Sequence, residues 1–247
     1  MSANGHPQEP MKVGISMVDV LTSLYAAIAI LAALRHRDQV SGRGQHIDLS
    51  LLDCGVASLS HFAMNWLVSG EVPQRRGNGG YGGVPSQAFR CRDGSIFVTA
   101  GNNRQFTALC EALGCASLGA DPRFDTTAGR VINRQALLSL LDAAFATRPV
   151  AEWLDRLDTA DVPAGPVNEL PGVFADPQVR HRGMLVEAEH PLAGTIRLLR
   201  NPLRLSDTPV TDYPAPPLLG QHTREVLAER LGFDTHRLDE LAAAHVI

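Results

Sequence analysis

Asp19 is the side chain of this sequence best placed for covalent chemistry. It stands directly before an apolar run, Val20–Leu34, which predicts a helix from Val20 to Arg37. Aspartate is favoured at the start of a helix, where free N–H groups and the helix dipole stabilise its anion. A carboxylate held in this state can attack an activated acyl group. Helix capping alone is the commoner reason for an aspartate at such a position, so the residue pattern leaves both roles open.

A glycine-rich segment, GNGGYGGVP at residues 77–85, is the second candidate. Glycine allows close approaches that a side chain would block, which suits Gly79, Gly80, Gly82 and Gly83 to covering a substrate or a reactive intermediate. The segment lacks the GK[ST] ending of a P-loop, and no strand and helix flank it as in a dinucleotide fingerprint. A flexible hinge between domains is the commoner explanation of such glycines.

The remaining patterns predict neither a metal site nor a permanently bound cofactor. The four cysteines form no CxxC pair, and the nine histidines form no HxxxH or HExxH pattern. Cysteines this few indicate free thiols in a reducing cytoplasm. Arg43, Arg75 and Arg76 are able to meet phosphates, although solvated surface charge is the commoner role.

Composition narrows the class of protein. The 247 residues are 45% hydrophobic and 19% charged, which is ordinary for a soluble globular protein and argues against disorder. The formal net charge of −4 argues against nucleic acid or an anionic membrane as a partner. The apolar run Val18–Leu34 contains Thr22, Ser23 and Tyr25, so we expect a buried helix rather than a membrane span.

The elements that must position these candidates follow from the residue periods. Alternating residues at 46–50 predict a strand, and Ser50 with Asp53 resembles a capping box that opens a helix reaching Val68. Further along the chain we expect a hairpin of strands at 89–91 and 95–99, followed by helices at 103–113, 134–146 and 150–158. A strand is expected at 195–199, and two closing helices at 223–231 and 235–244. Trp66 and Trp153, at helical spacing among apolar residues, are expected in the core.

These elements predict an α/β fold class with four segments. Residues 1–68 are expected to be the remnant of a large, Rossmann-like domain, and residues 69–84 a glycine-rich linker. Residues 85–165 are expected to form a small α+β domain, and residues 166–247 a return segment with the C-terminal helices.

Four stretches together resemble the family III CoA-transferases, also called the CaiB/BaiF family. They are GISMVDVLTSLYAAIAILAALRHRDQVSGRGQHIDLSLLDC at 14–54, the glycine-rich segment at 77–85, DVPAGPVNEL at 161–170 and LLGQHTREVLAERLGF at 218–233. In that family an aspartate precedes a long buried helix, followed by a TGRGQ-type turn and a D-x-S-L-L-D strand. The similarity runs in order along essentially the whole chain.

The resemblance implies an enzyme that moves CoA between small carboxylic acids through an aspartyl-CoA thioester, with Asp19 as nucleophile. It implies coenzyme A and acyl-CoA as substrates, a carboxylic acid as acceptor, a cytoplasmic location and an interlocked homodimer at full length. It also implies that the amino-terminal third, which holds most of the CoA-binding surface, is lacking here. Tyr81 and Ser86 differ from many relatives, which leaves the exchanged acids open.

Two alternatives remain at this point. An α-methylacyl-CoA racemase of the same superfamily uses the same aspartate as an acid or base. An inactive truncated fragment is the other alternative, and the activity of the 247-residue chain by itself is left open.

Overall fold

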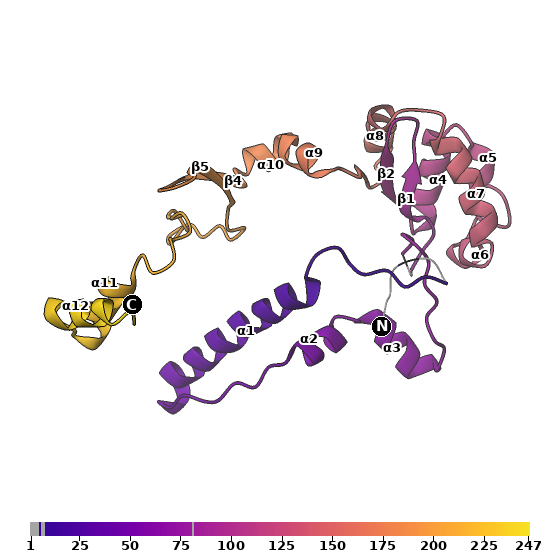
Figure 1. The fold of residues 1–247 in the computed structure, drawn as a ribbon. Helices are drawn as coiled ribbons and strands as arrows, with labels where there is room; N and C mark the ends of the chain where they lie inside the picture. The colour runs from indigo at the N-terminus through magenta and orange to yellow at the C-terminus, as the bar shows by residue number, and fades with distance from the viewer. Residues whose placement is uncertain (1–4, 6–7, 81) are drawn as a thin grey trace. The chain divides into compact units, whose positions relative to one another are not determined.

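The computed structural model describes residues 5, 8–80 and 82–247, and the chain divides into two compact units, Met1–Val167 and Asn168–Ile247 (Figure 1). Each unit combines helices with antiparallel strands. The expected mixed α/β class is therefore confirmed. The four predicted segments, with their boundaries at 68, 84 and 165, stay a prediction.

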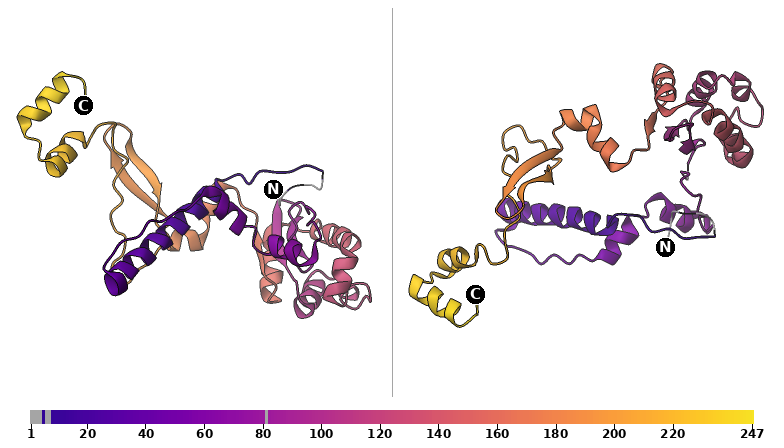
Figure 2. Two further views of the ribbon diagram at one scale, coloured as in Figure 1. Left: turned by 90° about the horizontal axis from the view of Figure 1, so that it is seen from below. Right: turned by 45° about the horizontal axis from the view of Figure 1, so that its top comes forward.

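The N-terminal part of the first unit is helical. Its elements are α1 (Met17–His36), a π-helical turn (Arg37–Ser41), α2 (Leu51–Ala57) and α3 (His61–Ser69). The chain runs back from the turn to α2, which packs near the start of α1 (Figure 2). A methyl group added to Gly55 of α2 would meet Cγ1 of Val18 at 3.7 Å, an ordinary packing contact.

Two sequence expectations fail in this part. Residues 46–50 form no strand, because a strand needs a partner for its backbone groups and none of the described residues pairs with this segment. The helix expected through residue 68 is interrupted at Ser60, whose positive φ of 46° is incompatible with a right-handed helix. The capping box is confirmed, since the Ser50 side chain accepts a hydrogen bond from the Asp53 N–H at 3.0 Å.

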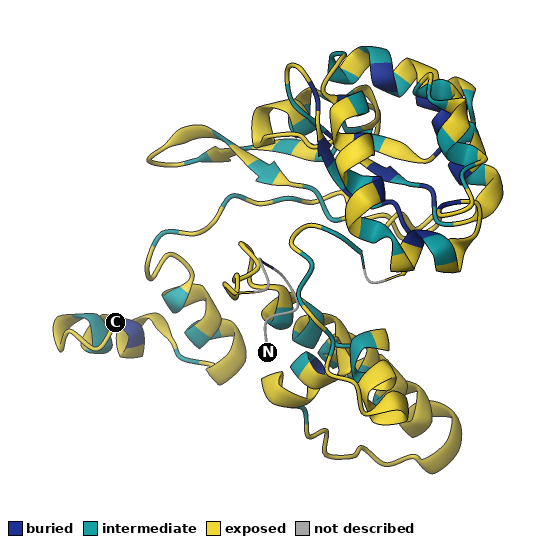
Figure 3. Cartoon of the chain, turned by 90° about the vertical axis from the view of Figure 1, so that its right-hand side faces the viewer, coloured by how far each residue is buried: buried dark blue, intermediate teal, exposed yellow. Residues whose placement is uncertain are grey.

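Helix α1 is apolar nearly all round, yet none of its residues is buried within this chain (Figure 3). Trp66 on α3 is also 50% exposed, so its expected place in the core is wrong here. Residues Met17–Ser41 are long and apolar enough to cross a membrane, contrary to the expectation from the shorter run. Core helices of soluble proteins meet the same criterion. Much of the apolar surface of α1 therefore stays exposed within the first unit.

The small α+β domain is the best-packed part of the first unit. A three-stranded antiparallel sheet has the order β1 (Ser86–Arg90), β2 (Ser95–Thr99) and β3 (Ala164–Pro166). Ser86 pairs with Thr99 and Arg90 with Ser95, which confirms the expected hairpin. The helices of the domain are α4 (Asn103–Ala112), α5 (Ala116–Gly119), α6 (Thr127–Ile132), α7 (Arg134–Phe145) and α8 (Val150–Thr159).

Aromatic packing fixes the core of this domain. The rings of Phe89 and Phe145 stack at 4.6 Å, and Phe145 meets Trp153 edge-on at 5.5 Å. The Trp153 indole N–H donates to the Phe145 carbonyl at 2.8 Å, so its polar group is satisfied although the side chain is buried. The expected core position of Trp153 is confirmed.

The second unit is made of short helices and one antiparallel pair of strands. They are α9 (Leu170–Ala175), α10 (Pro177–His181), β4 (Leu185–His190), β5 (Gly194–Leu199), α11 (Thr223–Leu231) and α12 (Thr235–Ala243). The expected strand at 195–199 and both closing helices are present, whereas sequence patterns missed α9, α10 and β4. Short helices of five or six residues carry too little periodicity to be recognised.

Candidate functional site

Asp19 lies in the first turn of α1 and does not cap it. The helix begins two residues earlier, and Ser16 occupies the N-cap position without a side-chain capping bond. The expected cap was misplaced because Met17 and Val18 are themselves compatible with a helix. The helix dipole still stabilises the Asp19 anion, as predicted, because a carboxylate in the first turn lies near the positive end of the dipole. Its side chain is exposed in this chain.

A hollow of about 850 Å³ lies beside Asp19. Its walls come from the segment that leads into α1, from the start of α1, and from α2, α3 and the turn between them. Most lining residues are apolar; the polar ones include Lys12, Ser16, Asp19, Ser58 and His61. Lys12 supplies a positive charge, and the N–H groups of the first turn of α1 lack partners within the helix. An apolar hollow with a carboxylate, a lysine and a helix N-terminus can hold an acyl group beside a nucleophile.

The glycine-rich segment lies against the small domain and contributes no lining residue to this hollow. The Gly80 N–H donates to the Ser86 carbonyl at 2.7 Å. A methyl group on Gly79 would collide with Nη2 of Arg134, and one on Gly83 would come within 2.8 Å of the Gly101 Cα.

Gly82 differs from these neighbours, because a methyl group there would meet none of the described residues within 4 Å. Packing of backbone on backbone therefore requires a glycine at position 83. The nearest neighbours of Gly79 and Gly80 are side-chain atoms that can shift, and Gly82 has no such neighbour among the described residues. Tyr81 lies outside the described residues.

Sequence reasoning missed two arginines that hold the glycine-rich segment. Arg130 is fully buried and donates from Nε to the Val84 carbonyl at 2.9 Å. Arg134 donates to Gln87 Oε1 at 3.2 Å and makes a long contact of 3.5 Å with the Gly80 carbonyl. Burial lowers the pKa of both guanidinium groups. Arg130 lies in a helix of six residues and Arg134 is the first residue of α7, and a charged residue at such positions gives no sequence signal of burial. Neither arginine was therefore predictable.

The other predicted candidates do not reach the hollow. Arg43 is exposed, Arg75 and Arg76 are half-buried, and none of the three lines it. Among the described residues no group of three or more His, Cys, Asp or Glu side chains could hold a metal ion. Cys54, Cys91, Cys110 and Cys115 are free thiols.

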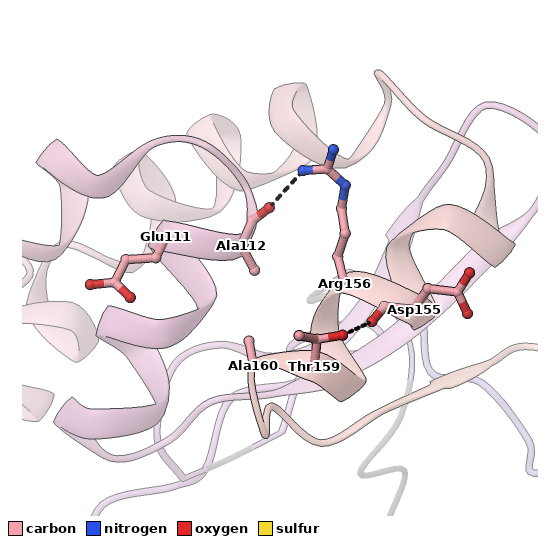
Figure 4. Close-up of a pocket in the computed structure, with 6 residues that line it drawn as sticks. All are labelled: Glu111, Ala112, Asp155, Arg156, Thr159 and Ala160. Atoms are coloured by element: carbon pink, nitrogen blue, oxygen red, sulfur yellow. Dashed lines mark hydrogen bonds between the residues drawn. The ribbon is translucent and has the colours of Figure 1, made fainter.

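A second pocket, of about 410 Å³, opens between α4 and α8 of the small domain (Figure 4). Its lining consists of Glu111, Ala112, Asp155, Arg156, Thr159 and Ala160. The polar groups are engaged locally: Arg156 Nη1 contacts the Ala112 carbonyl at 3.5 Å, and Thr159 Oγ1 donates to the Asp155 carbonyl at 2.8 Å. None of the predicted site residues lines this pocket, so the hollow beside Asp19 is the candidate active site.

Curated proteins with similar sequences are named as CoA-transferases. The chain is 39% identical over 239 residues to human succinyl-CoA:glutarate CoA-transferase. This alignment covers 97% of the chain and 54% of the relative. It is 37% identical over 230 residues to succinate–glutarate CoA-transferase of Agrobacterium fabrum, covering 93% and 57%. The chain thus spans about half the length of the curated relatives it matches.

A crystal structure of a CaiB/BaiF family protein from Brucella suis is similar in fold, with a TM-score of 0.76 and 39% identity. The match covers 92% of this chain and 58% of that protein. The fold is therefore of the CaiB/BaiF type. The family model of CoA-transferase family III matches residues 1–223, and this chain belongs to that family.

Proposed function

We propose that this chain carries the catalytic aspartate of an acyl-CoA:carboxylate CoA-transferase that exchanges CoA between small dicarboxylic acids. The observation that carries the proposal is the position of Asp19, in the first turn of α1 and on the wall of an apolar hollow. The substrates are suggested by the names of the human and Agrobacterium relatives, which act on succinate and glutarate.

The carboxylate of Asp19 acts as the nucleophile. Its oxygen attacks the thioester carbonyl of the donor acyl-CoA, and the C–S bond breaks to give an aspartyl–acyl anhydride and CoA thiolate. The thiolate then attacks the Asp19 carbonyl, which releases the donor acid and leaves an aspartyl-CoA thioester. The acceptor carboxylate repeats these steps in reverse and leaves with CoA. The overall reaction converts one CoA thioester into another, so no oxidant, metal or nucleotide is consumed.

Charge stabilisation falls to the residues around Asp19. Each addition places negative charge on an oxygen, which the N–H groups at the start of α1 and the Lys12 ammonium group can stabilise. Water must be kept from the anhydride, and Gly82 and Gly83 are the proposed cover. Gly82 suits this role because no packing contact explains its lack of a side chain.

The experiment that tests the proposal is a transfer assay with a trapped intermediate. The chain is assayed alone and co-expressed with the part of the Agrobacterium relative that it does not match, using succinyl-CoA and glutarate. We expect glutaryl-CoA from the complemented form and little from the chain alone. Hydroxylamine added after succinyl-CoA should convert Asp19 to a hydroxamate that mass spectrometry locates. Transfer without any modification of Asp19 would assign the chemistry to another residue.

Location and assembly belong to the same proposal. We propose a cytoplasmic enzyme that works as a homodimer, with acyl-CoA and a carboxylic acid as its partners and neither nucleic acid nor membrane. The exposed apolar surface of α1 supports an assembly in which this helix is covered. A racemase of the same superfamily is the less favoured alternative, because the relatives described above are named as transferases.

A further inference from the structure

Arg130 on α6 is the buried cation of the small domain, and its partners are backbone carbonyls. Its side chain has no exposed surface, and its guanidinium group donates to the carbonyls of Val84, Phe124 and Gly101 at 2.9, 2.9 and 3.2 Å. The guanidinium carbon also lies 4.6 Å from the centre of the Phe106 ring. Five donors in a fixed planar fork allow one arginine to join three separate chain segments in a defined geometry.

Two of the three carbonyls belong to segments that pack against each other. Val84 belongs to the glycine-rich segment, and Gly101 follows the strand β2. Gly83 and Gly101 lie backbone against backbone, since a methyl group on Gly83 would be 2.9 Å from the Gly101 carbonyl oxygen. Arg130 therefore holds both sides of this contact at once. The Thr127 hydroxyl completes the arrangement, accepting from Arg130 Nη2 at 3.1 Å and lying 3.3 Å from the Gly101 carbonyl.

A buried charge is a costly way to fill a core. Phe, Leu or Met would fill the same space without the desolvation penalty that a guanidinium group meets on burial. Such a residue persists where its hydrogen bonds define a backbone conformation that apolar packing would leave loose. The conformation defined here is that of residues 82–84 and 101.

We propose that Arg130 is a positioning residue for the transfer reaction: by joining Val84 to Gly101 it holds Gly82 and Gly83 in the conformation that shields the acyl intermediate on Asp19 from water. This inference rests on the proposed function. Arg130 touches no reacting atom and acts only through the glycine-rich segment.

Hydrogen exchange tests the structural half of the proposal without any activity. The Gly80 and Ala100 amides, which donate to the carbonyls of Ser86 and Pro85, report on the segment, and the Leu109 and Leu141 amides report on the core helices. Arg130→Lys keeps the charge but cannot reach three carbonyls. We expect faster exchange at Gly80 and Ala100 and unchanged exchange in the helices.

Arg123 provides the matched control. Its guanidinium group also lies over a ring, 4.8 Å from the centre of Phe124, but it pairs with Asp121 at the surface. Arg123→Lys should leave the Gly80 and Ala100 amides unchanged. Thr127→Val is a milder second variant, used if Arg130→Lys loosens the whole domain, and it should accelerate exchange at the same two amides.

Kinetics of the complemented enzyme tests the functional half. In Arg130→Lys we expect the ratio of thioester hydrolysis to transfer to rise about tenfold, while the KM for acyl-CoA changes less than about twofold. Thr127→Val should move the ratio in the same direction by a smaller factor. An unchanged ratio despite a loosened segment would overturn the positioning role. Equal acceleration of exchange in the helices and the segment, in both variants, would make Arg130 an ordinary core residue. If the unmodified enzyme transfers no CoA, the proposed function fails, and the exchange pattern still decides whether Arg130 holds the segment.

Discussion

The backbone of Gly83 packs directly on the backbone of Gly101, so closely that a methyl group on Gly83 would come within 2.8 Å of the Gly101 Cα. This contact joins the glycine-rich segment to the end of β2 (Ser95–Thr99) in the small domain. Backbone cannot move aside as a flexible side chain can. The glycine is therefore required by packing, whatever its part in catalysis.

Substitution of Gly83 should cost stability where substitution of Gly82 does not. We expect Gly83→Ala to lower the free energy of unfolding of the small domain by about 1–3 kcal/mol, the usual cost of overpacking. Gly82→Ala should change it by less than about 0.5 kcal/mol, because an added methyl group lies more than 4 Å from the residues that the structure describes. Urea denaturation followed by Trp153 fluorescence measures both. Equal stability of the two variants would contradict the packing role of Gly83.

Removal of the Asp19 carboxylate should separate chemistry from folding. We expect Asp19→Asn to reduce CoA transfer by more than about 10³-fold, because an amide cannot form the anhydride. Its effect on unfolding should stay below about 1 kcal/mol, the size of a charge–dipole interaction in an exposed first turn. Transfer rates and thermal unfolding of the complemented enzyme are the measurements.

Asp53 offers a control for this change. It lies in the first turn of α2, as Asp19 lies in the first turn of α1, and it lines no part of the hollow. Asp53→Asn should leave transfer within about twofold of the unmodified enzyme. A comparable loss of transfer in both variants would mean that charge at the helix starts matters, and that Asp19 is no nucleophile.

Sequence patterns predicted the elements whose structure depends on interactions between nearby residues. The β1–β2 hairpin around Arg92-Asp93-Gly94, the Ser50 cap and the amphipathic helices of the small domain were predictable because turn chemistry and periodicity act within a few residues. The resemblance to the family came from four stretches in order and was confirmed by the family match.

Features that depend on residues far apart in the chain could not be predicted from sequence patterns. A strand at 46–50 has the right alternation but finds no partner strand among the described residues. Trp66 has the helical spacing of a core residue, yet it is 50% exposed, because burial depends on what packs on its helix. Arg130 was missed for the opposite reason, because three carbonyls from separate segments create its buried site.

Stability of the small domain should fall in alkaline solution through Cys110. Burial, together with the neighbouring Cys115, raises the pKa of the Cys110 thiol from 9.0 to about 12. The folded protein then holds this proton more tightly than the unfolded chain does. The stabilisation is complete below about pH 9 and is lost as the pH rises towards 12. Unfolding free energies measured between pH 8 and pH 11 should therefore decrease.

Two substitutions isolate this thiol from other titrating groups. Cys110→Ala should be less stable at pH 8 but should lose less stability than the unmodified protein as the pH rises. Leu109→Ala, at an equally buried neighbouring position, should cost about 2–5 kcal/mol at every pH, because it removes no titrating group. Parallel pH curves for the unmodified protein and Cys110→Ala would contradict the assignment.

The last prediction concerns the uncovered surface of α1. Leu24, Ile28 and Leu31 are 56%, 63% and 66% exposed, and apolar surface gathered on one helix drives association in water. We expect the 247-residue chain by itself to self-associate and to bind a hydrophobic dye, with fast hydrogen exchange over 17–69 and slow exchange over 86–166.

The double substitution Ile28→Lys with Leu31→Lys should reduce association and dye binding together. Ile132→Lys removes a side chain that is 82% exposed on the small domain and should change neither, because isolated apolar residues on a surface are ordinary. Light scattering and dye fluorescence are the measurements. A monomeric chain that binds no dye and protects the α1 amides would show that α1 is covered from within.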